Sequence, residues 1–405
     1  MLTYKLDMIT FAALGAVLLL LGKWAVKRYR FLWQYSIPAP VVGGFGFAIV
    51  MWIVYELGLL ELHYDDTLYT LAMYVFFVTI GLTTGLIILK QGGRILLLYM
   101  LVCWLLAFVQ NGVSIGMSYL TGLNPLVGMI AGQASMQGGH GMAASMAPVI
   151  ESFGVTNALT VGLAASTFGL IAGSLLGGPV GNWLITRRKL KIETEAADQL
   201  KSLSDEMEQS AEDRMTAASL LHAGVAVMLI LAIGLPTARW ITAVTGFSIP
   251  GHIFSLFLGI VFYSINERRH WFALSDAAMG TISILALEMF LVMAMMKLKL
   301  WELYELALPL ALLLVAQVVC TILVAVFIMF RLIGRNYDAA VMSAGFIGHG
   351  LGATPNGLVV MDALCSKYGV FSKKAFIIIP VAGTVLTDVV GVPLFVFLAN
   401  LVGRG

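Results

Sequence analysis

Long apolar runs, separated by short charged clusters, constrain this chain more than any other feature of its sequence. A helix needs about 20 mostly apolar residues to cross a lipid bilayer. Ten such runs are present, the seventh being the shortest, at Met8–Val26, Val41–Leu60, Leu68–Leu89, Ile95–Leu120, Ala158–Ile185, Ala217–Ala243, Pro250–Ile265, Ala277–Leu298, Leu306–Phe330 and Ala375–Leu401. We therefore predict an all-α integral membrane protein with ten transmembrane helices.

The composition excludes several other classes of protein. Hydrophobic residues make up 60% of the chain and charged residues only 11%, whereas soluble domains carry about 25% charged residues. A net charge of +2 with scattered basic residues does not suit nucleic-acid binding. The cysteines at 103, 320 and 365 show neither a disulfide nor a zinc pattern. Because the first apolar run precedes its positive cluster, it is expected to remain as a helix and not to act as a signal peptide.

Two further apolar segments, near 125–150 and 337–364, are too rich in Gly, Ser and Pro for straight spanning helices. We interpret both as re-entrant hairpins, which return to the side from which they entered. With the first helix running inwards, 19 of the 24 Lys and Arg residues then lie in inside loops and 5 outside. This asymmetry agrees with the positive-inside rule. Both termini are predicted outside, and a charged linker at 187–216 is predicted to be cytoplasmic.

Landmarks recur in the same order about 212 to 215 residues apart. The pairs are Ile37-Pro38 with Ile249-Pro250, Asn124 with Asn336, Ala131-Gly132 with Ala344-Gly345, Phe153-Gly154-Val155 with Tyr368-Gly369-Val370, and Pro179 with Pro393. Five helices in each half is an odd number, so the halves would be inverted relative to each other, as in secondary carriers. We expect repeats at 1–186 and 217–405, although similar composition alone could also produce such matches.

The two Gly-rich hairpins are the predicted binding site. Glycine allows close backbone approaches, so a break in mid-membrane can direct carbonyls at a cation and N–H groups at an anion. No basic residue lies at the centre of a predicted span, so substrate carboxylates would meet helix N-termini, hydroxyls and amides. The candidate substrate-binding residues are Ser135, Gln137, Gly138, Gly139, His140, Gly141, Gly350, Gly352, Thr354, Pro355 and Asn356. Tight helix packing is the alternative explanation for the glycines.

Polar residues inside apolar runs indicate where a coupling ion binds. Intramembrane acids are costly and are therefore functional candidates. Asp388 lies deep in the last run, and Asn111 follows Gln110 at what we interpret as a break in the fourth run. Oxygen ligands suit a hard cation, so Asp388, Asn111 and hairpin carbonyls are predicted to bind sodium. Glu288 could instead face a partner helix, and proton coupling through His140 and His349 stays open.

At these residues the sequence resembles the bacterial sodium/glutamate symporter family. The matching stretches are PAPVVGG from Pro38, FFVTIGL from Phe76, QNGVSIGM from Gln110, GGHG from Gly138, TFGL from Thr167, GGPV from Gly177, LKLWEL from Leu298, GRNYDAAV from Gly334, GHGLGATP from Gly348 and the surroundings of Asp388. The resemblance implies sodium-coupled uptake of L-glutamate across a bacterial inner membrane. It also implies a lipid-embedded homodimer with an elevator-like movement of the hairpin-bearing bundle, and neither an enzyme nor a cofactor other than the coupling ion.

Three positions depart from the pattern expected of this family. Ala143 stands where the first hairpin would have another glycine, His349 where a bulky apolar or aromatic residue is expected, and Glu288 where a small polar residue is expected. These changes leave the fold untouched but keep another small organic anion or amino acid open as the substrate. A channel is an alternative because re-entrant loops also build pores. A membrane-embedded enzyme should show a cluster of acidic and basic residues at one membrane face, and no such cluster lies beside the glycine hairpins in this sequence.

Overall fold

A computed structural model describes residues 2–30, 32, 37–83, 93–190, 215–245, 249–269, 271, 272, 274–304, 306–383 and 388–403. These residues are almost all helical. The elements in chain order are β1 (Leu2–Leu6), α1 (Met8–Arg28), α3 (Ala39–Glu56), β2 (Leu60–Tyr64), α4 (Thr67–Leu82), α6 (Gly93–Thr121), α7 (Pro125–Met129), π-helical η1 (Ile130–Ala134), α8 (Gly139–Glu151), α9 (Ala158–Arg188), α11 (Ala217–Thr245), α12 (Gly251–Arg269), α13 (Asp276–Met296), 3-10 helical η3 (Leu300–Leu303), α14 (Ala307–Val324), π-helical η4 (Ala325–Met329), α15 (Phe330–Ile333), α16 (Tyr337–Tyr368), α17 (Lys373–Val381) and α18 (Asp388–Gly403).

The helices confirm an all-helical integral membrane protein, but not ten continuous spans. Within the described residues, 7 helices are long and apolar enough to cross a bilayer. The predicted tenth run is divided between α17 and α18, which flank residues 384–387 outside the described part. Most of the predicted linker, residues 191–214, also lies outside it.

A small parallel sheet, formed by β1 and β2, was missed by the sequence analysis. Leu2 pairs with Leu60 and Leu6 with Tyr64, which ties the start of the chain to the connection between α3 and α4. The Tyr64 hydroxyl donates to the Met296 carbonyl (3.2 Å) at the end of α13. The strands are short and sit between apolar runs, so hydrophobic periodicity gave no clear signal for them.

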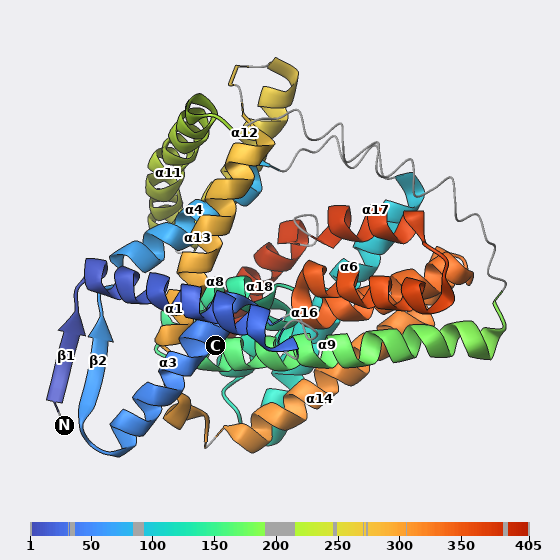
Figure 1. Cartoon of the computed structure of the whole chain (residues 1–405), viewed down its shortest axis with the longest axis horizontal. Coiled ribbons are helices and arrows are strands. Elements are labelled where there is room, and N and C mark those ends of the chain that lie inside the picture. Colours follow the sequence, from blue (N-terminus) through green and yellow to red (C-terminus); the bar gives the residue numbers. More distant parts are fainter. Residues whose placement is uncertain are drawn as a thin grey trace.

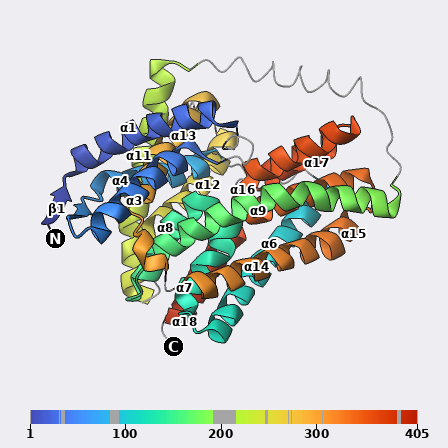
Figure 2. The ribbon, with the colours of Figure 1, turned by 60° about the horizontal axis from the view of Figure 1, so that its bottom comes forward.

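The helices form two bundles, seen side by side in Figures 1 and 2. The panel bundle contains α1, α3, α4, α11, α12 and α13, and the tip bundle contains α6 to α9 with α14 to α18. Contacts between the bundles are made mainly by α8 against α13 and by the η3 connection. Each bundle therefore takes part of its helices from each half of the sequence.

Glycines let α1 and α3 of the panel bundle pack backbone against backbone. A Cβ atom added to Gly43 would lie 2.0 Å from the Leu18 carbonyl oxygen, and one on Gly22 would lie 2.0 Å from that of Ala39. No side chain fits in such a space. Small residues at helix interfaces are the usual means of close packing in a membrane, where lipid removes the hydrophobic driving force between helices.

The first broken segment, residues 125–151, reverses direction. Its first limb lies antiparallel to α6, because Gly128 packs against Ser118 and Gly132 against Ser114. Its second limb, α8, lies antiparallel to α9: the Glu151 carboxylate accepts from the Leu159 N–H (3.2 Å). At the other end of α8, the His140 ring bonds to Thr167 (2.9 Å).

The second broken segment is α16, which turns back at Gly352 and Ala353, where the backbone leaves helical geometry. Its first limb is antiparallel to α9, with Gly181 beside Ala340 and Ala344, and Gly173 beside Gly348. The second limb returns parallel to α9, with Asn356 beside Gly173 and Leu364 beside Gly181. The Tyr337 hydroxyl closes the base by donating to the Val370 carbonyl (2.6 Å).

Helices at corresponding places in the two halves run antiparallel. In α6 and α14, Gln317 bonds to Ser114 (2.8 Å) and Thr321 to Gln110 (3.2 Å), so the residue numbers run in opposite directions. In α4 and α13, Lys297 just after α13 pairs with Asp66 just before α4 (2.7 Å). Asn124 and Asn336 both accept an N–H bond at the start of a broken segment.

The close contact of α1 and α3 predicts opposite effects for two glycines of α3. Gly43→Ala should destabilise the protein by about 1–3 kcal/mol because its methyl group overpacks the interface. Gly46→Ala is the matched control, since nothing lies within 4 Å of its added Cβ. Alanine favours helix over glycine by about 1 kcal/mol, so the control should be neutral or stabilising. Thermal unfolding of the purified protein in detergent measures both, and equal Tm values would contradict this packing.

Candidate functional site

The tips of the two broken segments meet beside the middle of α9. A Cβ atom on Gly139, in the first tip, would lie 3.1 Å from the Ala353 Cβ in the second. Gly169 of α9 contacts both sides, because its added Cβ would lie 2.2 Å from the Leu351 carbonyl oxygen and 3.1 Å from the Met136 sulfur. The two helix breaks, one in each half of the sequence, thus meet at one point of the structure.

Gln110 of α6 connects the tips by hydrogen bonds. Its amide NH₂ donates to the Gly350 carbonyl of the second tip (2.8 Å), and its Oε1 accepts from the Gln137 amide of the first (3.1 Å). Gln317 of α14 holds the Gln110 backbone by donating to its carbonyl (2.8 Å). Buried amides with several satisfied bonds fix geometry strongly in a low-dielectric interior. Gln110 is therefore a positioning residue for both tips.

In the first tip, the predicted polar residues hold the break against its neighbours. The Ser135 hydroxyl lies 2.5 Å from the Ile130 carbonyl oxygen and 2.9 Å from that of Gly162. Gly138 is closely packed, since its added Cβ would lie 2.6 Å from the Ala134 carbonyl oxygen. Gly139 has a φ of +64°, which favours glycine. His140 is bonded to Thr167 as described above, and Gly141 faces Leu287 and Phe76 of the panel bundle.

In the second tip, the Asn356 amide has structural partners. Its NH₂ donates to the carbonyls of Leu170 (3.1 Å) and Gly348 (3.2 Å), and its oxygen accepts from the Ser174 hydroxyl (2.5 Å). Gly352 packs on Leu170 and Asn356. These contacts tie the turn to α9 and leave the Asn356 side chain little capacity for a ligand.

The rest of the second tip is more available. Ala353 has a φ of +70°, a conformation that costs an L residue about 1–3 kcal/mol and that often marks functional sites. Thr354 is buried and faces Gly383, whose added Cβ would lie 2.4 Å from the threonine oxygen. Pro355 is exposed at the start of the second limb. The strained Ala353 was not found from sequence, because alanine carries no signal of its conformation.

Several buried polar atoms near the tips have no hydrogen-bond partner within the described chain. They are Oδ1 of Asn111, Oε1 and Nε2 of Gln133, Oε1 of Gln137, Oε1 of Gln317 and Nε2 of His349. Leaving such atoms bare costs about 1–3 kcal/mol each, so a ligand or an ion is a reasonable partner for them. Four of the six are amide oxygens, which are suitable ligands for a hard cation.

Asp388 and Asn111 stand at the edge of this group. Asp388 is the first residue of α18, and the first turn of that helix contacts η1, with Gly391 beside Gln133. No direct hydrogen bond joins Asp388 to Asn111 in the described residues. The predicted break at Asn111 is wrong: α6 is continuous there, and the Asn111 NH₂ donates to the Ala107 carbonyl (2.9 Å) within the helix.

Glu288 has a partner away from the tips. Its carboxylate pairs with Lys23 of α1 (2.7 Å), inside the panel bundle. This contact fits the sequence-based alternative that Glu288 faces a neighbouring helix.

Gln133, Gln317 and Thr321 were missed by the sequence analysis, although the rule applied to Asn111 would have found them. All three are polar residues in apolar runs, and Gln317 and Thr321 are spaced four apart on one face of α14.

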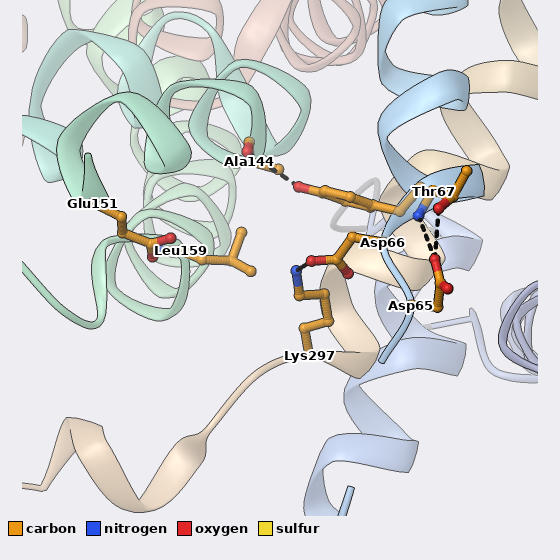
Figure 3. Close-up of polar contacts among 8 residues, drawn as sticks. Asp65, Asp66, Thr67, Ala144, Glu151, Leu159 and Lys297 are labelled. Carbon is orange, nitrogen blue, oxygen red and sulfur yellow. Dashed lines mark hydrogen bonds and ion pairs between the residues drawn. The ribbon is translucent and has the colours of Figure 1, made fainter. Parts of the chain in front are cut away.

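At one end of the molecule, a charged cluster links the two bundles (Figure 3). The Tyr69 hydroxyl of α4 donates to the Ala144 carbonyl of α8 (3.3 Å). The Lys297 ammonium pairs with Asp66 and lies 4.8 Å from the centre of the Tyr69 ring. Figure 3 shows Glu151 on the α8 side of this group, across from Lys297. Burial raises the pKa of the Glu151 carboxyl, and the Leu159 N–H and Lys297 oppose this rise.

Residues 4–370 match the family model for the sodium/glutamate symporter. The chain belongs to this family. It is 35% identical over 389 residues to the sodium/glutamate symporter of Escherichia coli, covering 96% of both chains. It is equally similar to that of Haemophilus influenzae, at 35% over 387 residues and 94% of both chains.

Membership of the sodium/glutamate symporter family makes this protein a transporter and not an enzyme. A solved sodium proton antiporter, MjNhaP1 from Methanocaldococcus jannaschii, covers 98% of the chain, but at 14% identity and a TM-score of 0.39 the likeness carries no structural conclusion. The site of this symporter family member therefore rests on the geometry of its own tips.

The role of Gln110 predicts a local loosening when its amide is removed. Gln110→Leu removes the side-chain donor to the Gly350 carbonyl, at about 1–3 kcal/mol. It also removes one of the two acceptors of the Gln137 amide, which keeps the Cys103 carbonyl. Since 1.4 kcal/mol corresponds to tenfold, amide hydrogen exchange at residues 133–139 and 348–354 should be about tenfold faster or more. Hydrogen–deuterium exchange with mass spectrometry measures this.

Thr121→Ala is the control, because Thr121 is the last residue of α6 and its hydroxyl donates to the Met117 carbonyl of the same helix (2.8 Å). It should leave exchange at both tips unchanged. Faster exchange at one tip only would show that Gln110 does not join them.

Proposed function

We propose that this protein takes up L-glutamate together with sodium. Its relatives from E. coli and H. influenzae carry the name sodium/glutamate symporter, which supports both the substrate and the coupling ion. The observation that carries the proposal is the meeting of two broken segments beside bare amide oxygens. Backbone breaks inside a membrane are tolerated where they are buried in protein or line a site. Carriers use such breaks to bind ions and anionic substrates.

The proposed membrane arrangement has two re-entrant hairpins in two inverted repeats, at 1–186 and 217–405, joined by the linker at 187–216. The reversed limbs of both broken segments and the antiparallel pairs α6–α14 and α4–α13 support it. Ten crossings then result if the α17–α18 pair is counted as one interrupted span. Interrupted helices are common at the binding sites of secondary carriers.

We propose a homodimer in the bacterial inner membrane with both termini outside. Two contacts support placing the termini on one side. The N-terminal strand β1 pairs with β2, and β2 is followed by Asp66, which pairs with Lys297. Gly403, near the end of the chain, packs on Phe153, just after Glu151. With this side taken as the outer one, the basic residues divide 19 inside to 5 outside, which supports the orientation by the positive-inside rule.

The ligands would be bound by different groups. Sodium would take carbonyl and amide oxygens near η1 together with the Asp388 carboxylate, which suits a hard cation. Glutamate carboxylates would take backbone N–H groups in the first turns of the second limbs, near Gly139–Gly141 and at Thr354, where helix dipoles favour negative charge. Pro355, which has no N–H, would fix the start of the second limb beside them. Binding of either ligand would order the same two tips, so each ligand would raise the affinity for the other, and this mutual effect couples sodium to glutamate.

Uptake into proteoliposomes is the direct test of the function. Labelled glutamate should accumulate saturably under an inward sodium gradient and not under a matched potassium gradient. Unlabelled dicarboxylates and other amino acids serve as competitors. Sodium-dependent binding of another anion without glutamate uptake would contradict the substrate, and uptake unaffected by sodium would contradict the coupling ion.

Asp388→Asn tests the sodium site. Removing the carboxylate should weaken sodium binding, because a lost charge-assisted interaction costs about 1.5–3 kcal/mol. The half-saturating sodium concentration should therefore rise about tenfold or more. The glutamate affinity measured at saturating sodium should change far less. Asp362→Asn, an exposed acid on the second limb, is the control. An unchanged sodium response in Asp388→Asn would remove this residue from the site.

We further propose that the tip bundle moves past the panel bundle as an elevator. The sparse contacts between the bundles support this, since the Tyr69 hydroxyl bond and the Glu151–Lys297 cluster are their main polar link. A single hydrogen bond such as that of the buried Tyr69 hydroxyl contributes about 0.5–1.5 kcal/mol net, and a partly exposed charge pair contributes no more, so both can be exchanged at small cost during movement.

A reversible cross-link tests this movement. In a cysteine-free background, Tyr69→Cys and Ala144→Cys place thiols on α4 and α8, separated by about the length of the lost tyrosine ring. A bifunctional thiol reagent with a central disulfide can bridge them, and this cross-link should stop transport until the reagent's disulfide is reduced. The control is Asn182→Cys with Tyr368→Cys, which joins two elements of the tip bundle whose native side chains are 2.7 Å apart. That cross-link should leave transport largely intact. Full activity with the first pair locked would exclude relative movement of the bundles.

A further inference from the structure

An apolar groove lies on the outer surface of the tip bundle, away from the tips. It has a volume of about 390 Å³ and is lined by α9 on one side and by α14 with η4 on the other. Its lining residues are Pro179, Val180, Trp183, Ile322, Leu323, Val326 and Phe327. Trp183, Leu323 and Phe327 are each about half exposed. On α9, the glycines at 173, 177 and 181 face the second broken segment instead.

Both walls of the groove continue to an arginine at the same end. Helices α9 and α14 lie side by side (Figure 2). Both run opposite to α6: α14 is antiparallel to α6 as described above, and α9 runs with the first limb of the broken segment 125–151, which is also antiparallel to α6. Arg187 follows Trp183 by four residues, so both lie on one face of α9. Arg331 follows Phe327 by four, and its guanidinium carbon lies 5.5 Å from the Phe327 ring centre.

The two arginines have no acidic partner among the described residues. Both are exposed, and neither forms an ion pair with any residue that the structure describes. An exposed tryptophan one turn away marks the level of the lipid headgroups, where its ring is preferred. In the membrane arrangement proposed above, the apolar trough would lie at the depth of acyl chains and the two positive charges at the depth of phosphates.

We propose that this groove binds an anionic phospholipid, with one acyl chain along Val180 and Val326 and the phosphate between Arg187 and Arg331. The charge of the two arginines selects the headgroup, and the membrane itself supplies the ligand. By the positive-inside rule this is the cytoplasmic leaflet. The groove also contains the π-helical turn η4, a departure from α-helix that is frequent at functional sites.

The size of the expected preference follows from the charges. Each basic residue near an anionic lipid surface contributes about 1 kcal/mol. Because 1.4 kcal/mol corresponds to tenfold, two arginines can favour an anionic over a zwitterionic lipid by up to about 30-fold. The acyl chain adds affinity without selecting between lipids of the same chains.

Native mass spectrometry of the full-length protein in detergent tests the site. The probes are phosphatidylglycerol and phosphatidylethanolamine with identical acyl chains, supplied in equal amounts. The wild type should retain phosphatidylglycerol preferentially, and Arg187→Gln with Arg331→Gln should bring the ratio close to one. The control, Lys27→Gln with Arg28→Gln, removes two charges from the last turn of α1 in the panel bundle and should keep the preference.

Two more measurements separate a lipid site from other occupants. Leu323→Trp fills the groove and should lower retention of both lipids without lowering the Tm of the lipid-free protein. Water-soluble glycerol phosphate should not compete with the lipid. An unchanged ratio in the double arginine variant, equal loss in the control pair, unchanged retention in Leu323→Trp, or competition by glycerol phosphate would each overturn the proposal.

Discussion

The need to satisfy backbone polar groups away from water governs this structure. In lipid, unpaired N–H and C=O groups cost several kcal/mol each, so a break in a helix must be surrounded by protein. Both breaks in this chain are placed against α9 and α6. In the broken segments themselves, the Gln110 amide donates to the Gly350 carbonyl, the Ser135 hydroxyl to that of Ile130 and the Asn356 amide to that of Gly348. The small residues of the tips allow these partners to come close enough.

Helix α9 provides the common surface for both broken segments. Its first half receives the first segment near Gly162, and its second half receives both limbs of α16 along Gly173, Gly177 and Gly181. Glycine costs helix stability in isolation, but here it permits contacts with backbone carbonyls that no larger residue allows. The panel bundle touches this assembly mainly through α8, so the binding region and its support are built as separate units.

Much of the architecture could be predicted from hydrophobic runs, charge and glycine content. The broken segments begin at the asparagines that the repeat singled out, since each asparagine caps a helix start. The sequence could not show that the Asn356 amide donates to the Leu170 carbonyl of α9, which is 186 residues away. Nor could it show that Glu288 pairs with Lys23, which is 265 residues away. It also could not show the conformation of Ala353, and the continuity of α6 at Asn111 depends on neighbouring helices.

The contact between Gly139 and Ala353 has an electrical consequence. In the proposed membrane arrangement, the two segments reach this contact from opposite faces, so the barrier between the two aqueous sides is thin here. A membrane potential falls mainly across the thinnest insulating layer, and a full crossing is worth about 2.3 kcal/mol per elementary charge at 100 mV. A cation bound beside Gln110 would therefore cross most of the membrane potential, and release most of this energy, by moving only a short distance past the tips.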